Sequence, residues 1–171
     1  LSPSTRVNID VKSSPLGPQR QQDNRKLSHK AMARIEAMSP LPFTLEACAD
    51  GEGTIRVLKV PFCSPKNSFL DYNCEGGMVY MNPPFQNPQP FNLHYLECKE
   101  RRPHDTGCIL LLPEWKHNQK WSDQFLRDWT LLYQFPKFSP IFEISNNEGG
   151  DSRMKGTPWP RNVWLDLPRE D

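Results

Sequence analysis

Short apolar runs, separated by polar and proline-rich segments, form the hydrophobic pattern of this chain. The run at 108–112 is apolar throughout, which is typical of a parallel strand buried on both faces of a sheet. Other runs are rich in β-branched and aromatic residues and also predict strands. The complete set of predicted strands is 43–49, 57–60, 78–81, 108–112, 131–135, 141–144 and 162–167.

Helical signals occur between these runs. Residues 27–38 carry a capping Ser28, and a second helix is expected to begin at Asn87 as N-cap with Pro88 in the first helical position. A third helix is expected at 120–128. The apolar positions that share a helix face are Met32, Ile35 and Met38 in the first helix, and Phe91, Tyr95 and Cys98 in the second.

The order of these elements predicts an α/β domain. A strand–helix–strand centre with strand-rich ends favours a mostly parallel sheet with an antiparallel edge. Residues 1–25 are rich in Ser, Pro, Gln and Arg and are predicted to be a linker or extended arm. The folded domain is expected at 26–168. Residues 61–67 and 146–156 are expected to be irregular.

Composition narrows the class of protein. A chain of 171 residues suits one domain, and a net charge of +1 argues against tight DNA binding driven by charge alone. Five cysteines without a C-x-x-C pair predict reduced thiols in an intracellular protein, with no metal site. No apolar run approaches membrane-spanning length. The chain begins with Leu1, so we expect a processed product or a segment of a longer protein.

The strongest candidate chemistry is the sequence Asn82-Pro83-Pro84-Phe85 after the run at 78–81. The side-chain oxygen of Asn82 and the carbonyl of Pro83 can both accept hydrogen bonds from a planar NH2 group. Phe85 can stack on the attached ring. The prolines fix φ near −65°, so the acceptors are aimed before a substrate arrives. Asn-Pro is also common turn chemistry, which is the alternative reading.

A second candidate is the acidic, glycine-bearing loop at 50–53 that follows the predicted strand at 43–49. A strand followed by such a loop is one way in which α/β folds receive a nucleotide-like cofactor. This loop lacks G-x-G-x-x-G, so an ordinary turn after a strand explains it equally well.

Taken in order, these segments resemble the compact DNA N6-adenine methyltransferases of the phage Dam type, whose domain also occurs in DIRS-type tyrosine-recombinase retrotransposons. The strand at 43–49 is similar to the first strand of that family, with Glu46 where the family usually has Asp. Residues 79–85 match its catalytic motif. The remaining matches are 67–70 before the catalytic strand, 109–113 as the next strand and 156–160 as the closing segment.

The resemblance implies a Rossmann-like methyltransferase fold, S-adenosylmethionine as methyl donor and the N6 amine of adenine in DNA as acceptor. It assigns catalysis to Asn82, Pro83, Pro84 and Phe85, and cofactor binding to Glu46, Ala47, Cys48, Ala49, Asn67 and Ser68. It implies no metal. Because no separate target-recognition domain is evident, we expect weak DNA binding with low sequence specificity.

Three alternatives stay open. The same chemistry can act on RNA bases or on a protein glutamine, or the chain can be an inactive segment of a retroelement polyprotein. The expected compartment is the nucleus for a eukaryotic element and the cytoplasm for a phage or bacterial one.

Overall fold

The computed structural model describes residues 26–49, 58–84, 86–114, 119–145 and 152–170. The predicted arm at 1–25 lies outside this range, and the predicted domain boundary stays a prediction. None of the helices in the described ranges has the length and apolar character needed to cross a membrane. The elements are β1 (Lys26–Leu27), α3 (His29–Met38), β2 (Phe43–Glu46), η1 (Phe69–Asp71), β3 (Gly77–Met81), α4 (Gln89–Arg101), β4 (Thr106–Pro113), α5 (Gln119–Phe125), β5 (Thr130–Phe135), β6 (Phe142–Ser145), β7 (Ser152–Lys155) and β8 (Arg161–Asp166).

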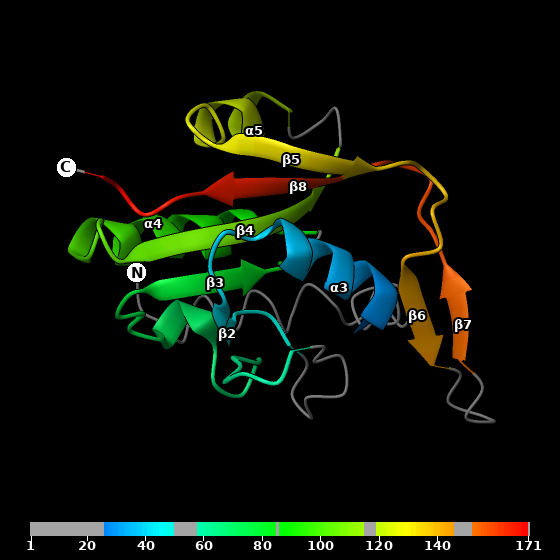
Figure 1. The fold of residues 1–171 in the computed structure, drawn as a ribbon, viewed down its shortest axis with the longest axis horizontal. Helices are drawn as coiled ribbons and strands as arrows, with labels where there is room; N and C mark the ends of the chain where they lie inside the picture. The colour runs from blue at the N-terminus through cyan, green and yellow to red at the C-terminus, as the bar shows by residue number, and fades with distance from the viewer. Residues whose placement is uncertain (1–25, 50–57, 85, 115–118, 146–151, 171) are drawn as a thin grey trace.

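A five-stranded mixed sheet in the order β2-β3-β4-β8-β5 forms the centre of the molecule (Figure 1). β2, β3 and β4 are parallel, and β8 is antiparallel to both of its neighbours, β4 and β5. The predicted α/β class is therefore confirmed. The edge strand β5 pairs antiparallel with β8, as predicted, but the strand that runs opposite to the others is β8, which lies inside the sheet between β4 and β5.

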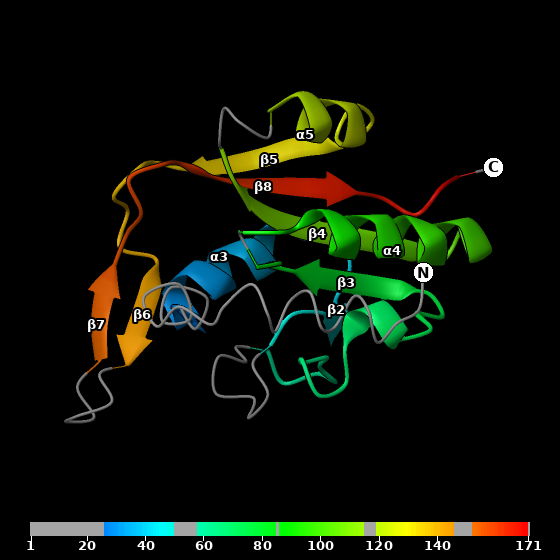
Figure 2. The same cartoon turned by 180° about the vertical axis from the view of Figure 1, so that it is seen from behind.

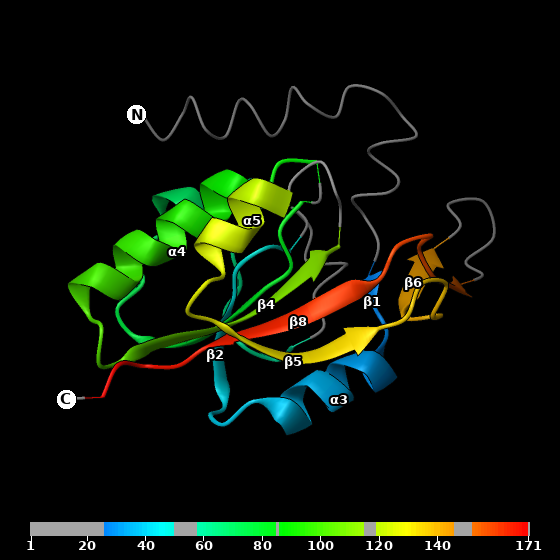
Figure 3. The same cartoon turned by 90° about the horizontal axis from the view of Figure 1, so that it is seen from above.

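Helices cover both faces of this sheet. α4 and α5 lie on one face and α3 on the other (Figures 2 and 3). Each face of the sheet has its own hydrophobic core, and alternate residues of a strand point into one core or the other because side chains alternate along a strand. On β3, for example, Val79 and Met81 join the core that includes α4, whereas Met78 and Tyr80 join the core that includes α3. β4 is buried from Thr106 to Leu112, as its uninterrupted apolar run predicts.

A second, antiparallel sheet of β1, β6 and β7 projects from one end of the molecule (Figure 1). Two predictions are wrong here. Residues 152–155 were expected to be irregular but form β7, because this polar segment pairs along its length with β6. Leu27 was expected to start a helix, but it pairs with Phe142, and the helix begins after Ser28.

Two further expectations near the carboxyl edge of the sheet are corrected. The described part of the strand predicted at 57–60 consists of bends, whereas Phe62, in a segment expected to be irregular, forms a parallel bridge with Glu46. The N-cap of α4 is Pro88 rather than Asn87, and it makes no side-chain capping bond. Asn87 instead donates its backbone N–H to Pro84 O, which closes the turn after β3.

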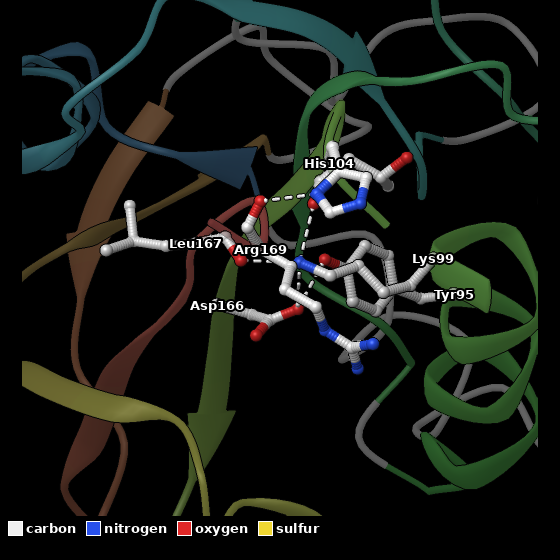
Figure 4. Close-up of polar contacts among 7 residues, drawn as sticks. Tyr95, Lys99, His104, Asp166, Leu167 and Arg169 are labelled. Carbon is white, nitrogen blue, oxygen red and sulfur yellow. Dashed lines mark hydrogen bonds and ion pairs between the residues drawn. The ribbon is translucent and has the colours of Figure 1, made fainter. Parts of the chain in front are cut away.

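At the opposite end of the strands, where β4 begins and β8 ends, α4 holds the segment that follows β8 (Figure 4). Tyr95 donates its hydroxyl hydrogen to Asp166 at 2.7 Å, and Lys99 Nζ lies 3.2 Å from the same carboxylate oxygen. Lys99 also donates to Leu167 O. The helix, the end of β8 and the outgoing chain are therefore joined by one ion-pair network.

Candidate active site

The carboxyl ends of β2, β3 and β4 meet at one edge of the sheet because these strands are parallel. On its outer side, β2 pairs with Phe62 through Glu46; on its inner side, Ala47 N donates to Tyr80 O of β3 at 2.9 Å. The chain thus passes outward from β2, returns across it to β3, and continues through α4 to β4. The chain leaves β2 toward Phe62 on one side and leaves β3 toward β4 on the other side. Ligands of open α/β sheets bind at the switch point between two strands whose connections run in opposite directions in this way.

Asn82, Pro83 and Pro84 follow β3 directly at this switch point. Asn82 and Pro84 are half-buried and Pro83 is buried. Within the described residues, neither the Asn82 side chain nor Pro83 O has a hydrogen-bond partner, whereas Pro84 O accepts from Asn87 N at 3.2 Å. Two acceptors on consecutive residues are thus without a partner in the part of the chain that the structure describes. Phe85 lies outside the described residues, so its stacking role stays a prediction.

The end of β2 supplies small residues beside this turn. Ala47 and Ala49 are buried and Cys48 is half-buried. Ala49 N donates to Cys63 O at 2.8 Å, so the segment after β2 is held between β3 and the outer chain. The predicted cofactor residues 47–49 therefore lie next to the end of β3, although the acidic loop at 50–53 is outside the described residues.

Glu46 is placed differently from its neighbours. Its side chain is only 3% exposed, and its carboxylate accepts a hydrogen bond from Leu58 N at 3.1 Å. The side chain of Leu58 belongs to the core on the α3 face. Glu46 thus anchors the backbone at Leu58 to the end of β2. A direct contact between Glu46 and a cofactor stays a prediction.

Asn67 and Ser68 lie on the outer side of β2. Asn67 pairs with Ser64 through two backbone hydrogen bonds of 3.1 Å, and Ser64 follows the Cys63 that bonds to Ala49. Ser68 is buried and caps η1, because its hydroxyl accepts from Leu70 N at 3.1 Å. Both residues are therefore near the end of β2, and the Ser68 hydroxyl already has a local structural role.

Sequence reasoning missed a polar group where β4, β5 and β8 meet at this edge. Gln134 Nε2 donates to Glu114 at 3.1 Å and to Asn162 at 2.8 Å. Each of these polar residues lies at or next to a strand end, which was the available signal. Their proximity depends on β8 running antiparallel between β4 and β5, and the chain pattern did not reveal that arrangement.

Tyr80 was also missed, because it reads as an ordinary strand residue. Its side chain is 2% exposed, and within the described residues its hydroxyl has no hydrogen-bond partner. Burial first, and then the nearby charge of Glu46, raises the pKa of Tyr80 well above its usual value, while Arg161 partly offsets this. The phenol is therefore neutral at physiological pH, two residues before Asn82.

Among the described residues, no three His, Cys, Asp or Glu side chains gather as possible ligands of a metal ion. Cys63 is one of the buried residues near β2, and burial, with a smaller contribution from Cys98, raises its pKa to about 12. It is therefore a protonated core thiol at neutral pH, as is expected for a buried cysteine in apolar surroundings.

Comparison with known proteins adds a distant structural likeness. No protein-family model and no curated protein matches the chain. Among solved structures, the chain is similar to a protein from Pyrococcus horikoshii described as a "putative RNA methyltransferase", with 13% sequence identity and a TM-score of 0.41. The likeness covers 74% of this chain and 64% of that one, which is less than two thirds of its length.

Proposed function

We propose that this chain is an S-adenosylmethionine-dependent methyltransferase that acts on the N6 amine of adenine in DNA. The observation that carries the proposal is a pair of acceptors, the Asn82 side-chain oxygen and Pro83 O, which have no partner among the described residues and lie at the end of β3 beside the switch point. An exocyclic amine has two N–H donors, and the adjacent residues Asn82 and Pro83 each offer one acceptor.

The proposed work of these residues is orientation. With both amine hydrogens held by Asn82 and Pro83, the nitrogen lone pair is directed away from the turn and toward the methyl donor. When bound, S-adenosylmethionine supplies a methyl group made electrophilic by its positively charged sulfur. The prolines at 83 and 84 restrict the backbone, so little reorganisation is needed on binding. Phe85 is assigned to stacking on the base.

The end of β2 is suited to hold the cofactor. Ala47 and Ala49 are small, buried residues beside the turn after β3, and Cys48 is the half-buried residue between them. This arrangement supports a cofactor at the carboxyl ends of β2 and β3, where it would be next to the held amine. Direct contacts from Glu46, Asn67 and Ser68 are part of the proposal.

DNA is the proposed substrate, and the net charge of +1 supports weak binding. A base in a duplex must leave the stack before its amine reaches such a turn, so single-stranded DNA is expected to react faster. RNA bases and glutamine amides have the same donor group, and they are the alternatives that a substrate comparison separates.

The first test is calorimetric titration of the folded chain with S-adenosylmethionine. The proposal expects saturable binding at one site; a demonstrably folded chain that binds none contradicts it and favours an inactive segment. Transfer of a labelled methyl group is then compared on single-stranded DNA, duplex DNA, RNA and a glutamine peptide. Labelled N6-methyladenine in DNA supports the substrate assignment, whereas transfer only to RNA or peptide contradicts it.

Asn82→Ala tests the residue that carries the proposal. Loss of a preorganised polar group of this kind is expected to lower the rate of methyl transfer by about 10²–10³-fold, with cofactor binding largely retained. Asn73→Ala is the matched control, since Asn73 is an exposed residue in the loop that precedes the opposite end of β3. Equal rates for wild type and Asn82→Ala would refute the role of the turn.

A further inference from the structure

The segment between β5 and β8 leaves the central sheet at the same edge as Asn82. β5 ends at Phe135 and β8 begins at Arg161, and these two residues are register partners. Arg161 also pairs with Pro113, the last residue of β4, which runs parallel to β3. Residues 136–160 therefore leave and re-enter the sheet at the carboxyl end of β4, and the second sheet projects from that end (Figures 1 and 2).

The first turn of this segment, at residues 136–139, is held tightly against the last part of the segment. Phe138 N donates to Thr157 O at 2.6 Å. A Cβ added at Gly156 would collide with the backbone carbonyl groups of Phe138 and Ser139, so only glycine lets the two parts of the chain approach this closely. The turn is therefore a rigid support built from backbone contacts.

Phe138 has an unusual backbone conformation in this turn. Its φ is +65°, and among the described residues it is the only one besides glycine with a positive φ. This conformation is an outlier for a bulky residue, and such outliers persist where surrounding contacts enforce them and cluster at functional sites. A glycine would fit this position with less strain, so the folding of the turn does not explain why a phenylalanine ring is here.

The ring of Phe138 lies outside both hydrophobic cores. The residue is 66% exposed, which is the largest fraction among the exposed large apolar residues of the described chain. An aromatic ring left in water gains free energy when a partner covers it. Because the ring has only two rotatable bonds and the turn beneath it is rigid, little conformational entropy is lost on binding. Phe138 is therefore suited to contact a flat partner.

Two lysines flank this ring. Lys137 directly precedes Phe138, and Lys155 directly precedes the Gly156 that touches the Phe138 backbone; both lysines are exposed. Neither forms an ion pair with a residue in the part of the chain that the structure describes. The described part of the segment holds one acidic residue, Glu143. An exposed aromatic ring is thus accompanied by two exposed positive charges.

An aromatic ring flanked by cations fits an unpaired nucleotide. Every nucleobase has a flat π-face that stacks on an aromatic side chain, and the phosphates on either side pair with lysine. A base inside a duplex has both faces covered by its neighbours, so it must leave the stack before it offers a face. An aliphatic partner also covers a ring, but it gives no role to the lysines.

We propose that Phe138 is a stacking platform for an unpaired base of single-stranded DNA, with Lys137 and Lys155 bound to the adjacent phosphates. β5 is three strand spacings from β3 in the sheet order, which amounts to about 14 Å. A strand held on Phe138 is therefore within a few nucleotides of the turn at Asn82. The inference rests on the proposed function for its choice of DNA, but binding itself requires no methyl transfer.

Fluorescence anisotropy of the whole chain with a labelled oligonucleotide of about 12 thymidines tests the proposal. Thymine has no exocyclic amine, so this probe does not supply the donors that the acceptors at Asn82 and Pro83 are proposed to hold. We expect saturable binding to the single strand and weaker binding once it is paired with oligodeoxyadenosine. A folded chain that does not bind, that prefers the duplex, or that binds only an oligouridine of the same length overturns the proposal. A chain that binds the probe but transfers no methyl group contradicts the proposed function alone.

Variants at Phe138 test the stacking contact. Phe138→Ala is expected to weaken binding of the thymidine probe about tenfold, because stacking on the base is lost. Phe138→Trp should retain binding, whereas Phe138→Leu should not, since leucine is apolar but has no π-face. Tyr72→Ala is the matched control, because Tyr72 is a 43% exposed aromatic residue that precedes β3 at the opposite edge. Equal losses from Phe138→Ala and Tyr72→Ala would contradict the platform.

Phe138→Gly separates the ring from the fold. Glycine adopts a φ of +65° without strain, so this variant should melt at a temperature no lower than that of Phe138→Ala, while it binds the probe as weakly. Wild-type affinity in Phe138→Gly would refute the stacking role.

Lys137→Gln and Lys155→Gln test the phosphate contacts. Each is expected to reduce the slope of log Kd against log salt concentration by about 0.7, the value for one phosphate contact on a single strand. Unchanged slopes in both variants would contradict these contacts. If a second copy of the chain covers Phe138 instead, sedimentation without DNA will show a dimer that Phe138→Ala dissociates, and that result would overturn the proposal.

Discussion

At the scale of a single residue, Gly77 sets the path of the chain into β3. Its φ is +89°, which side chains rarely adopt, and an added Cβ would collide with the side chain of Thr44 on β2. We expect Gly77→Ala to lower the free energy of unfolding by about 1–3 kcal/mol, because it adds both backbone strain and a steric clash. Urea denaturation monitored by circular dichroism measures the change.

A double-mutant cycle separates the two causes. Thr44→Ala removes the hydroxyl oxygen that an alanine at 77 would meet first, together with the more distant methyl group. The loss caused by Gly77→Ala should therefore be smaller in the Thr44→Ala background than in wild type. Identical losses in both backgrounds would show that the clash contributes nothing and that backbone strain accounts for the whole effect.

At the scale of one element, α3 depends on Ser28. The hydroxyl of Ser28 accepts a hydrogen bond from Ala31 N at 3.1 Å, and Ser28 N donates to Ile141 O at 2.7 Å. Ser28→Ala should lower the free energy of unfolding by about 1 kcal/mol, because one helix donor loses its acceptor. Thermal or urea unfolding measures it. Ser28→Thr retains a hydroxyl and is the control; a loss as large as that of alanine would contradict the capping explanation.

The elements themselves were largely predictable. α3 and its cap, α4, β3 and β4 were predicted nearly within their bounds, since each has a local period or an apolar run that does not depend on a partner. β7 was not predictable, because its residues are polar and become a strand only by pairing with β6. The bridge at Phe62 was missed for the same reason.

At the scale of the whole molecule, Lys99 joins α4 to the first residue of β4 and to the last residue of β8. It donates to Thr106 O at 2.7 Å and forms the ion pair with Asp166, and its side chain is only 12% exposed. Lys99→Met should lower the free energy of unfolding by about 1–3 kcal/mol, because several acceptors lose their donor in a largely buried place. Urea denaturation again measures the effect.

Lys59→Met is the control for this prediction. Lys59 is exposed, so the same substitution there should change stability by no more than about 0.5 kcal/mol. The chain after β8 is also held by Arg169, whose N–H donates to Pro103 O at 2.7 Å. Residues 167–170 should therefore become more sensitive to protease in Lys99→Met without being released completely. An unchanged stability would show that the network in Figure 4 is neutral.

The sequence by itself determined the α/β class, most of the helices and strands, and the turn with its two acceptors at Asn82 and Pro83, because these follow from local periodicity and from the chemistry of adjacent residues. The tertiary structure decided where β8 lies and that the Glu46 carboxylate accepts a hydrogen bond from Leu58 N. Each of these depends on contacts between segments distant in the chain. A local pattern indicates that a strand is present, but it does not indicate which distant segment will pair with that strand.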